Sequence, residues 1–241
     1  MEIQGCVALV TGANRGLGRT FVDALLAAGA AKVYAAVRDP RTISNPMVTT
    51  IRLDVSSAEE VAAAAARCTD VTLLINNAGI MLGTPMLTAA GSEEAMRREL
   101  EVNVFGTLRM IRAFAPALAR NGGGAIVNVL SVVSWFTAPF NATYCASKHA
   151  ELAVTDACRI QLKAQRTQVL GVYAGYIDTD MAANVEAEKS TPREVVERTL
   201  EGVESGIDHV LADASARETW QTRCAAPREL EQEMQAAWDA R

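Results

Sequence analysis

The chain reads VALVTGANRGLG from Val7 to Gly18. A short β-branched run enters a turn with glycines at 12, 16 and 18, and a segment of helical period follows. Glycine lets the backbone turn tightly and approach a pyrophosphate, whose charge is met by the free N–H groups and dipole of the helix start. Because the turn follows the first expected strand and precedes a second that ends near Val37, it predicts a dinucleotide-binding site.

The alternation of short β-branched runs with longer Ala- and Leu-rich segments continues to about residue 173. We expect strands near 4–10, 32–37, 48–52, 71–75, 124–129 and 167–173, with a weaker one near 207–211. Helices are expected at 16–28, 57–67, 92–120, 143–164, 192–203, 213–223 and 227–239. Right-handed crossovers between sequential strands then predict an α/β fold, a single Rossmann-type doubly wound parallel sheet with helices on both faces.

Length and composition favour one domain over residues 1–241, in which 180–241 form a short substrate lid, the last strand and the C-terminal helices. Half of the residues are hydrophobic and 21% are charged, which excludes a disordered chain. The net charge of −5 argues against a nucleic-acid or anionic-membrane partner. Apolar runs are too short to span a bilayer and no leader pattern precedes the first strand, so we expect a cytoplasmic location.

Histidine and cysteine give no sign of a metal site. His149 and His209 are solitary, and the five cysteines include no Cys-x-x-Cys pair. An odd set of this kind fits reduced, mostly buried thiols. Cys145 adjoins Tyr144, but one step along a helix is a rotation of about 100°, which turns the two side chains apart.

Tyr144 and Lys148 stand four residues apart in the run Tyr-Cys-Ala-Ser-Lys, and Ser131 lies upstream. On a helix, positions i and i+4 share a face, so the ammonium lies one turn from the phenol. A nearby cation favours the phenolate, which makes Tyr144 a candidate acid/base group. An isolated Tyr-x-x-x-Lys match also arises by chance, so its meaning depends on the rest of the chain.

Other motifs occur in a fixed order: Thr-Gly-x-x-x-Gly-x-Gly from Thr11, Asp54-Val55, Asn76-Asn77-Ala78-Gly79 and Asn103. With Ser131, Tyr144 and Lys148, they make the chain resemble the short-chain dehydrogenase/reductase family, of the NADP(H)-preferring type, over residues 5 to about 181. Chance does not supply so many matches in one order.

The resemblance implies that Asn103, Ser131, Tyr144 and Lys148 form a catalytic tetrad. Tyr144 would exchange a proton with the substrate oxygen, Ser131 would hold that oxygen, and Lys148 would lower the pKa of the tyrosine and bind the nicotinamide ribose. Asn103 would end a proton relay through a water held near its backbone, or else be a helix-interior polar residue satisfied locally. Ser134 competes with Ser131 but stands where the family usually carries glycine.

The same resemblance implies a set of cofactor-binding residues. They are Gly12, Asn14, Arg15, Gly16, Leu17, Gly18, Arg38, Asp54, Val55, Asn77, Ala78, Gly79, Tyr144, Lys148, Gly175, Ile177 and Thr179. Arg38 ends the second strand where an NAD-binding chain usually has an acidic residue, and Arg15 precedes the second motif glycine. Both suit a 2′-phosphate and favour NADP(H) over NAD(H), although Asp39 could neutralise Arg38 or contact a ribose itself.

The family usually has Pro-Gly after the sixth strand, but this chain has Ala174-Gly175, which puts the rigidity of that loop in doubt. The following lid, 180–191, is short, so the site is expected to be open to a bulky substrate. Candidate substrate-pocket residues are Met81, Ser131, Trp135, Phe136, Tyr176 and Met181, with Ile80 and Phe140 as further apolar walls. Each apolar candidate could equally belong to the core.

Together these features predict an NADP(H)-dependent oxidoreductase that transfers a hydride between nicotinamide and a fairly apolar ketone, aldehyde or secondary alcohol, in the carbonyl-reducing direction. The family also implies a homodimer or homotetramer. Two alternatives stay open: a dinucleotide-binding sensor or scaffold on the same fold, and an epimerase or dehydratase that uses the same Tyr and Lys with tightly held cofactor.

Overall fold

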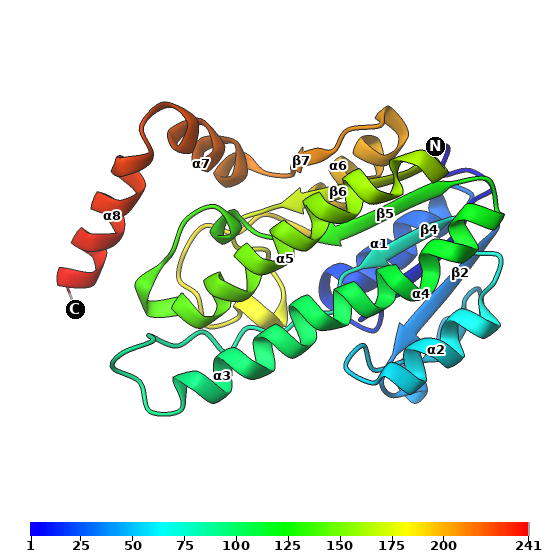
Figure 1. Ribbon diagram of the computed structural model, residues 1–241, viewed down its shortest axis with the longest axis horizontal. Helices are drawn as coiled ribbons and strands as arrows, with labels where there is room; N and C mark the ends of the chain where they lie inside the picture. The colour runs from blue at the N-terminus through cyan, green and yellow to red at the C-terminus, as the bar shows by residue number, and fades with distance from the viewer. Residues whose placement is uncertain (241) are drawn as a thin grey trace.

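The computed structural model describes residues 1–240, which form one parallel sheet of seven strands with helices on both faces (Figure 1). The strands are β1 Val7–Thr11, β2 Lys32–Val37, β3 Thr49–Arg52, β4 Leu73–Asn76, β5 Gly124–Val129, β6 Thr167–Tyr173 and β7 His209–Leu211. The α-helices are α1 Gly16–Ala27, α2 Ala58–Arg67, α3 Ser92–Glu99, α4 Thr107–Arg120, α5 Ala142–Leu162, α6 Pro192–Ser205, α7 Ala214–Ala225 and α8 Pro227–Asp239. The predicted α/β class and doubly wound sheet are confirmed.

The strand order β3-β2-β1-β4-β5-β6-β7 places the start of the chain at the middle of the sheet. The chain winds outward from β1 to β3, then returns to add β4 beside β1 and winds the other way. Ligands of open α/β sheets bind beyond the carboxyl ends of the strands where the winding reverses. The glycine turn after β1 and the Asn-Asn-Ala-Gly turn after β4 meet at this point.

Successive side chains of each strand enter different core layers, because strand residues point alternately to the two faces of a sheet. In β1, Ala8 and Val10 pack with α1 and α6, whereas Leu9 packs with α2, α4 and α5. Both faces are covered, so β1 reads as an unbroken apolar run. Helices α4 and α5 cross one face of the sheet, as Figure 1 shows.

A third apolar cluster joins the end of the sheet to the C-terminal helices. Trp135 is 5% exposed and stacks on Tyr173, with ring centroids 4.1 Å apart. Trp220 of α7 lies against the same tryptophan at 5.0 Å. The cluster attaches α7 to the domain.

Within residues 1–240 no helix has the length and apolar character that a membrane crossing needs.

The expected element bounds differ from the observed ones in a few places. The predicted helix 92–120 is interrupted by the π-helical segment Leu100–Gly106, which holds Asn103. The predicted strand 4–10 begins only at Val7, because Gly5 takes a φ of 78° and Cys6 closes a turn onto the Ile3 carbonyl. Helix α5 and the 3-10 turn after it end where Arg166 enters the left-handed region with a φ of 59°.

Candidate active site

The glycine turn between β1 and α1 is built for close approach of the backbone. Gly12 and Gly16 have φ values of 65° and 49°, which favour glycine, and a Cβ on Gly18 would lie 2.2 Å from the Gly12 carbonyl oxygen. Among the described residues no side chain caps α1, so N–H groups of its first turn remain available to an anion. These features fit a dinucleotide pyrophosphate.

Thr11 and Asn77 lock this turn to the end of β4. The Thr11 hydroxyl accepts hydrogen bonds of 3.0 Å from the backbone N–H groups of Asn77 and Ala78. The Asn77 amide in turn donates to the carbonyl oxygens of Thr11 and Gly12, at 2.9 and 3.3 Å. The two loops of the topological switch point therefore hold each other in place.

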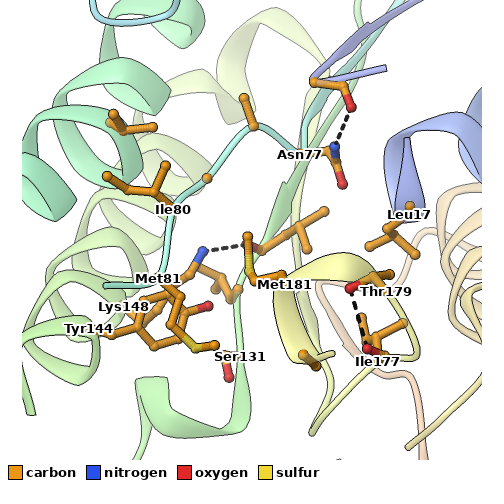
Figure 2. Close-up of a pocket in the computed structure, with 18 of the residues that line it drawn as sticks. Leu17, Asn77, Ile80, Met81, Ser131, Tyr144, Lys148, Ile177, Thr179 and Met181 are labelled. Atoms are coloured by element: carbon orange, nitrogen blue, oxygen red, sulfur yellow. Dashed lines mark hydrogen bonds between the residues drawn. The ribbon is translucent and has the colours of Figure 1, made fainter. Parts of the chain in front are cut away.

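One cavity of about 720 Å³ runs from the glycine turn to α5 and the C-terminal helices. Each of the seventeen cofactor-binding residues named from the sequence lines it: Gly12, Asn14, Arg15, Gly16, Leu17, Gly18, Arg38, Asp54, Val55, Asn77, Ala78, Gly79, Tyr144, Lys148, Gly175, Ile177 and Thr179. This volume lies within the range of about 300–1,000 Å³ that is typical of ligand-binding pockets. Figure 2 shows the central part of this cavity.

Three arginines and two aspartates bear on the choice of cofactor, and of these Arg15, Arg38 and Asp180 line the cavity. Asp39 accepts hydrogen bonds from Arg41 and forms a salt bridge with it at 2.9 Å. Within the described chain Arg38 forms no salt bridge, so the alternative in which Asp39 neutralises Arg38 is not what the structure has. Arg15 pairs with Asp180 at 3.2 Å, and both side chains are largely exposed. Exposed pairs of this kind contribute about 1 kcal/mol or less, so a phosphate can replace Asp180 as the partner.

Asp54 also lines the cavity. Its carboxylate accepts hydrogen bonds from the backbone N–H and the hydroxyl of Ser56, at 2.9 and 2.6 Å. Burial acts to raise the pKa of Asp54, but the Ser56 hydrogen bonds and the Arg38 charge outweigh it and hold the pKa below its usual value. The carboxylate is therefore ionised and fixed in direction.

Tyr144, Lys148 and Ser131 converge on the cavity from α5 and from the end of β5. In Figure 2 Tyr144 and Lys148 come from one helix, and Ser131 and Met81 line the same cavity. The Lys148 ammonium lies 5.8 Å from the centroid of the Tyr144 ring. It donates hydrogen bonds to the Val129 carbonyl at 2.8 Å and to the Glu151 carboxylate at 2.7 Å.

The pKa of Tyr144 is raised above its ordinary value, with burial as the main cause. Lys148 acts in the opposite direction, as expected from the sequence, but Glu151, Cys145 and Glu99 add to the effect of burial. Lys148 alone thus does not bring the tyrosine below its ordinary pKa. In this state Tyr144 is a phenol, which is the form that donates a proton.

The two candidate serines occupy different environments. Ser131 lines the cavity, and its hydroxyl accepts a hydrogen bond from the Val133 N–H and donates to the Ala174 carbonyl at 3.4 Å. Ser134 is 1% exposed, and its hydroxyl accepts from the Ser131 N–H. Of the two, only Ser131 faces the space beside Tyr144. Cys145 is fully buried and burial raises its pKa to about 11, so its thiol stays protonated.

Asn103 is fully buried and does not line the cavity. Its side-chain oxygen accepts the Ile80 N–H at 2.9 Å, and its amide donates to the Ile80 carbonyl at 2.9 Å and to Ser147 at 3.0 Å. The side chain thereby fastens the loop after β4 to α5. This agrees with the locally satisfied alternative for the side chain, and the relay through its backbone stays a prediction.

The loop after β6 is held by a residue that sequence reasoning did not find. Asp213 accepts the Gly175 N–H and the Ser190 hydroxyl, each at 2.9 Å, and also caps α7 through the Ala216 N–H at 2.7 Å. Thr179 packs on the glycine turn, where a Cβ on Gly16 would lie 3.2 Å from its methyl group. The loop is thus anchored without the proline that Ala174 replaces.

Most of the predicted substrate walls line the cavity, namely Met81, Ser131, Phe136, Tyr176 and Met181, together with Ile80 and Phe140. The prediction for Trp135 is wrong. This side chain belongs to the third core cluster, where it stacks on Tyr173, and it also contacts Trp220 in a tilted arrangement; it does not line the cavity. The C-terminal helices add Ser215, Thr219 and Met234, which the sequence reading missed. The spacing of Leu230, Met234 and Trp238 along one face of α8 was the available signal.

Two buried carboxylates beside the site were also missed. Glu151 contacts Lys148, and Glu99 of α3 accepts the N–H groups of Leu82 and Gly83 at 2.7 and 3.0 Å. Both are at most 2% exposed. An acidic residue three positions after Lys148 on a helix was the signal for Glu151.

Comparison with known proteins agrees with this geometry. The family model described as short chain dehydrogenase matches residues 6–190. A solved short chain dehydrogenase from Burkholderia cenocepacia J2315 in complex with NADP is 46% identical, with a TM-score of 0.94, and the match covers 97% of this chain and 99% of that one.

Two relatives of known name are more distant. The chain is 34% identical to human 17-beta-hydroxysteroid dehydrogenase type 1 over 209 residues, 80% of this chain and 62% of that protein's length. It is 31% identical to carbonyl reductase [NADPH] 2 of Sus scrofa over 229 residues, which covers 90% of this chain and 93% of the relative. The order of the motifs, the fold and these matches agree: the chain belongs to the short-chain dehydrogenase family and is an oxidoreductase of that family.

Proposed function

We propose that this protein is an NADP(H)-dependent carbonyl reductase that acts on a bulky, fairly apolar ketone or aldehyde and forms the alcohol. The observation that carries the proposal is the convergence of Tyr144, Lys148 and Ser131 on the cavity that the glycine turn opens into. The nicotinamide, when bound, supplies the hydride. All other tasks fall to residues of this chain.

Tyr144 donates the proton that converts the carbonyl oxygen to a hydroxyl. Its raised pKa keeps it a phenol, and its position on the cavity wall gives the substrate oxygen access to it. Ser131 holds that oxygen through its hydroxyl at the end of a buried strand. Lys148 places a positive charge near the phenol and stabilises the phenolate left after proton transfer.

NADP(H) is proposed over NAD(H) on charge grounds. Arg38 lines the cavity while Asp39, the residue beside it, is engaged by Arg41. Arg15 lies in the same region with a partner that a phosphate can replace. The solved relative from Burkholderia cenocepacia, which binds NADP, supports the same choice.

The apolar walls support a bulky substrate. Met81, Phe136, Phe140, Met181 and Met234 supply flexible or aromatic surface to the cavity that Tyr144 also lines. The two named relatives, a hydroxysteroid dehydrogenase and a carbonyl reductase, point to the same class of substrate. In that class of substrate, the ketone and the secondary alcohol differ by a hydride and a proton.

The direct test is Tyr144→Phe, assayed with NADPH on a panel of apolar ketones. We expect turnover to fall about a hundredfold or more, because the proton donor is lost, while NADPH binding is retained. Tyr176→Phe is the matched control, since Tyr176 lines the same cavity and is given no proton to transfer. Turnover of Tyr144→Phe close to that of the wild type would overturn the proposal.

Cofactor choice is tested by titrating NADPH and NADH into the wild type, Arg38→Ala and Arg41→Ala. We expect NADPH to bind more tightly than NADH, and Arg38→Ala to weaken NADPH binding by about tenfold or more with little change for NADH. Arg41→Ala is the control: it removes an exposed arginine that forms a salt bridge with Asp39, and the preference for NADPH over NADH should be retained. Tighter binding of NADH by the wild type would refute the assignment.

We also propose that the protein forms a homodimer or homotetramer through α4 and α5. Phe105, in the π-helical segment just before α4, is 49% exposed and Ile160 of α5 is 77% exposed, which is costly for apolar side chains in water. Light scattering at micromolar concentration tests this. A monomeric mass would count against it.

A further inference from the structure

Lys148 is not alone in the interior, because Glu151 one turn further along α5 meets its ammonium. The Lys148 side chain is 7% exposed and the Glu151 side chain 2%, and their N–O distance is 2.7 Å. A charge buried to this degree is costly unless it is paired. The proposed reaction assigns no task to Glu151.

The hydrogen bonds around the pair fix the direction of the ammonium. Lys148 donates to the Val129 carbonyl and to one oxygen of Glu151, which occupies two of its three N–H groups. The other oxygen of Glu151 accepts the Thr107 hydroxyl at 3.2 Å. Both carboxylate oxygens are therefore engaged, and one N–H of Lys148 is left for the cavity.

We infer that Glu151 is a positioning residue of the proposed reaction. Its buried carboxylate keeps Lys148 charged and holds the ammonium against the Val129 carbonyl, which leaves a single N–H of Lys148 free to donate into the cavity. The inference rests on the proposed function, because it acts through Lys148 and Tyr144. Glu151 lies outside the tetrad, and its proposed role depends on its negative charge and not on its hydrogen bond with Thr107.

The electrostatic consequence has a definite sign. Burial acts to lower the pKa of Lys148, but the charges of Glu151 and of the Tyr144 phenolate outweigh it, so the pKa is raised. Glu151 also raises the pKa of Tyr144. The other titratable groups acting on Tyr144 are Cys145 on the same helix and Glu99 on α3, and both add to the raised pKa.

Reduction requires Tyr144 as a phenol and Lys148 as an ammonium, and both lose their protons as the pH rises. The negative charge of Glu151 raises the pKa of both groups, so its removal lowers the pH at which the pair loses its first proton, whether Tyr144 or Lys148 releases it. The alkaline limb of the pH profile should therefore move toward neutral pH. A residue that merely ties α5 to α4 would leave that limb where it is.

The test compares pH profiles of kcat and kcat/KM for ketone reduction in the wild type, Glu151→Gln and Thr107→Val. Glu151→Gln keeps the size of the side chain and removes its charge, and we expect the alkaline limb to move down by about one pH unit. Thr107→Val keeps the charge and removes only the Thr107 hydrogen bond, so its limb should stay with the wild type. If Glu151→Gln does not fold, Glu151→Asp withdraws the charge from Lys148, and a smaller shift in the same direction is expected.

The outcomes are distinct. An unchanged limb in a folded Glu151→Gln overturns the inference, and an equal shift in Thr107→Val assigns the effect to the tie between helices and overturns it too. Tyr144→Phe is measured alongside. If Tyr144→Phe is active, the proposed function fails; if it is inactive and Glu151→Gln keeps the wild-type limb, the inference about Glu151 fails alone.

Discussion

The backbone N–H of Gly175 donates a 2.9 Å hydrogen bond to the carboxylate of Asp213, which lies 38 residues further along the chain. Asp213 is 1% exposed and serves the loop after β6, the Ser190 hydroxyl and the start of α7 at once. The loop that borders the nicotinamide end of the proposed site is thus fixed by the C-terminal part of the chain.

Replacing Asp213 by Asn should loosen this loop. An amide nitrogen cannot accept a hydrogen bond, so one of the two carboxylate positions loses its donors, and we expect the free energy of unfolding to fall by about 1–3 kcal/mol. NADPH binding should weaken as well. Urea unfolding and NADPH titration measure the two effects, with the exposed Asp23→Asn as control. Lower stability with unchanged NADPH affinity would show that the loop does not depend on Asp213 for binding.

Gly18→Ala tests the close approach in the glycine turn. The added methyl group would lie 2.2 Å from the Gly12 carbonyl oxygen, so the turn must open. We expect a loss of about 1–3 kcal/mol in stability from overpacking, together with a clear loss of NADPH affinity. Gly206→Ala is the control, because its methyl group meets open space at a φ of 71° and adds only backbone strain. Retained NADPH affinity in Gly18→Ala would contradict the assigned role of the turn.

Trp135 and Phe136 are neighbours with opposite expected effects. Trp135→Phe reduces the stacking on Tyr173 and the tilted ring contact with Trp220, and should lower stability by about 1–2 kcal/mol with little change in KM. Phe136→Ala removes a cavity wall and should raise KM for a bulky ketone severalfold. Thermal unfolding and steady-state kinetics on both variants check this. A KM effect confined to Trp135→Phe would restore Trp135 to the substrate site.

His209 predicts a pH dependence of stability near neutral pH. Burial is the main cause that lowers its pKa from 6.5, and its ring accepts or donates a 3.1 Å hydrogen bond with the Tyr173 hydroxyl. A lowered histidine pKa means that the unfolded chain binds the proton more readily, so this contribution is present above pH 6.5 and is lost as the pH falls below it.

The effect is small because His209 lies at the exposed start of β7. Unfolding measured between pH 8 and 5.5 should show the loss in the wild type and in His149→Gln, the variant of the other histidine, and a shallower loss in His209→Phe. Equal slopes in all three proteins would rule out this role of His209.

The parts of the site that the sequence predicted well are those that local geometry determines. Gly12, Gly16 and Gly18 lie in one turn and the helix start that follows it. Tyr144 and Lys148 are one helical turn apart. In both cases the spacing in the sequence is enough to predict how the residues are arranged in space. Asn77 and Ser131 end neighbouring strands of a parallel sheet, and the strand order brings them to the same edge.

The parts it missed depend on contacts between distant segments. Asp213, Ser215 and Met234 reach the site only because α7 and α8 fold back over it, and no spacing rule links them to Gly175 or Phe136. Trp135 was misplaced for the same reason: both a cavity and a core offer apolar surroundings, and its partner Trp220 lies far along the chain.

The π-helical segment Leu100–Gly106 joins α3 to α4 and sets the direction in which the side chains of α4 point. A π turn holds one more residue than an α turn, so α4 is rotated by about 100° from the position that an unbroken helix would give it. That rotation turns Ile111, Phe114 and Leu118 toward the sheet. Deleting one residue from this segment would make the helix more regular, yet it would turn either Asn103 from Ile80 or the α4 stripe from the core. The length of the segment is therefore as much a determinant of the site as the identity of Asn103.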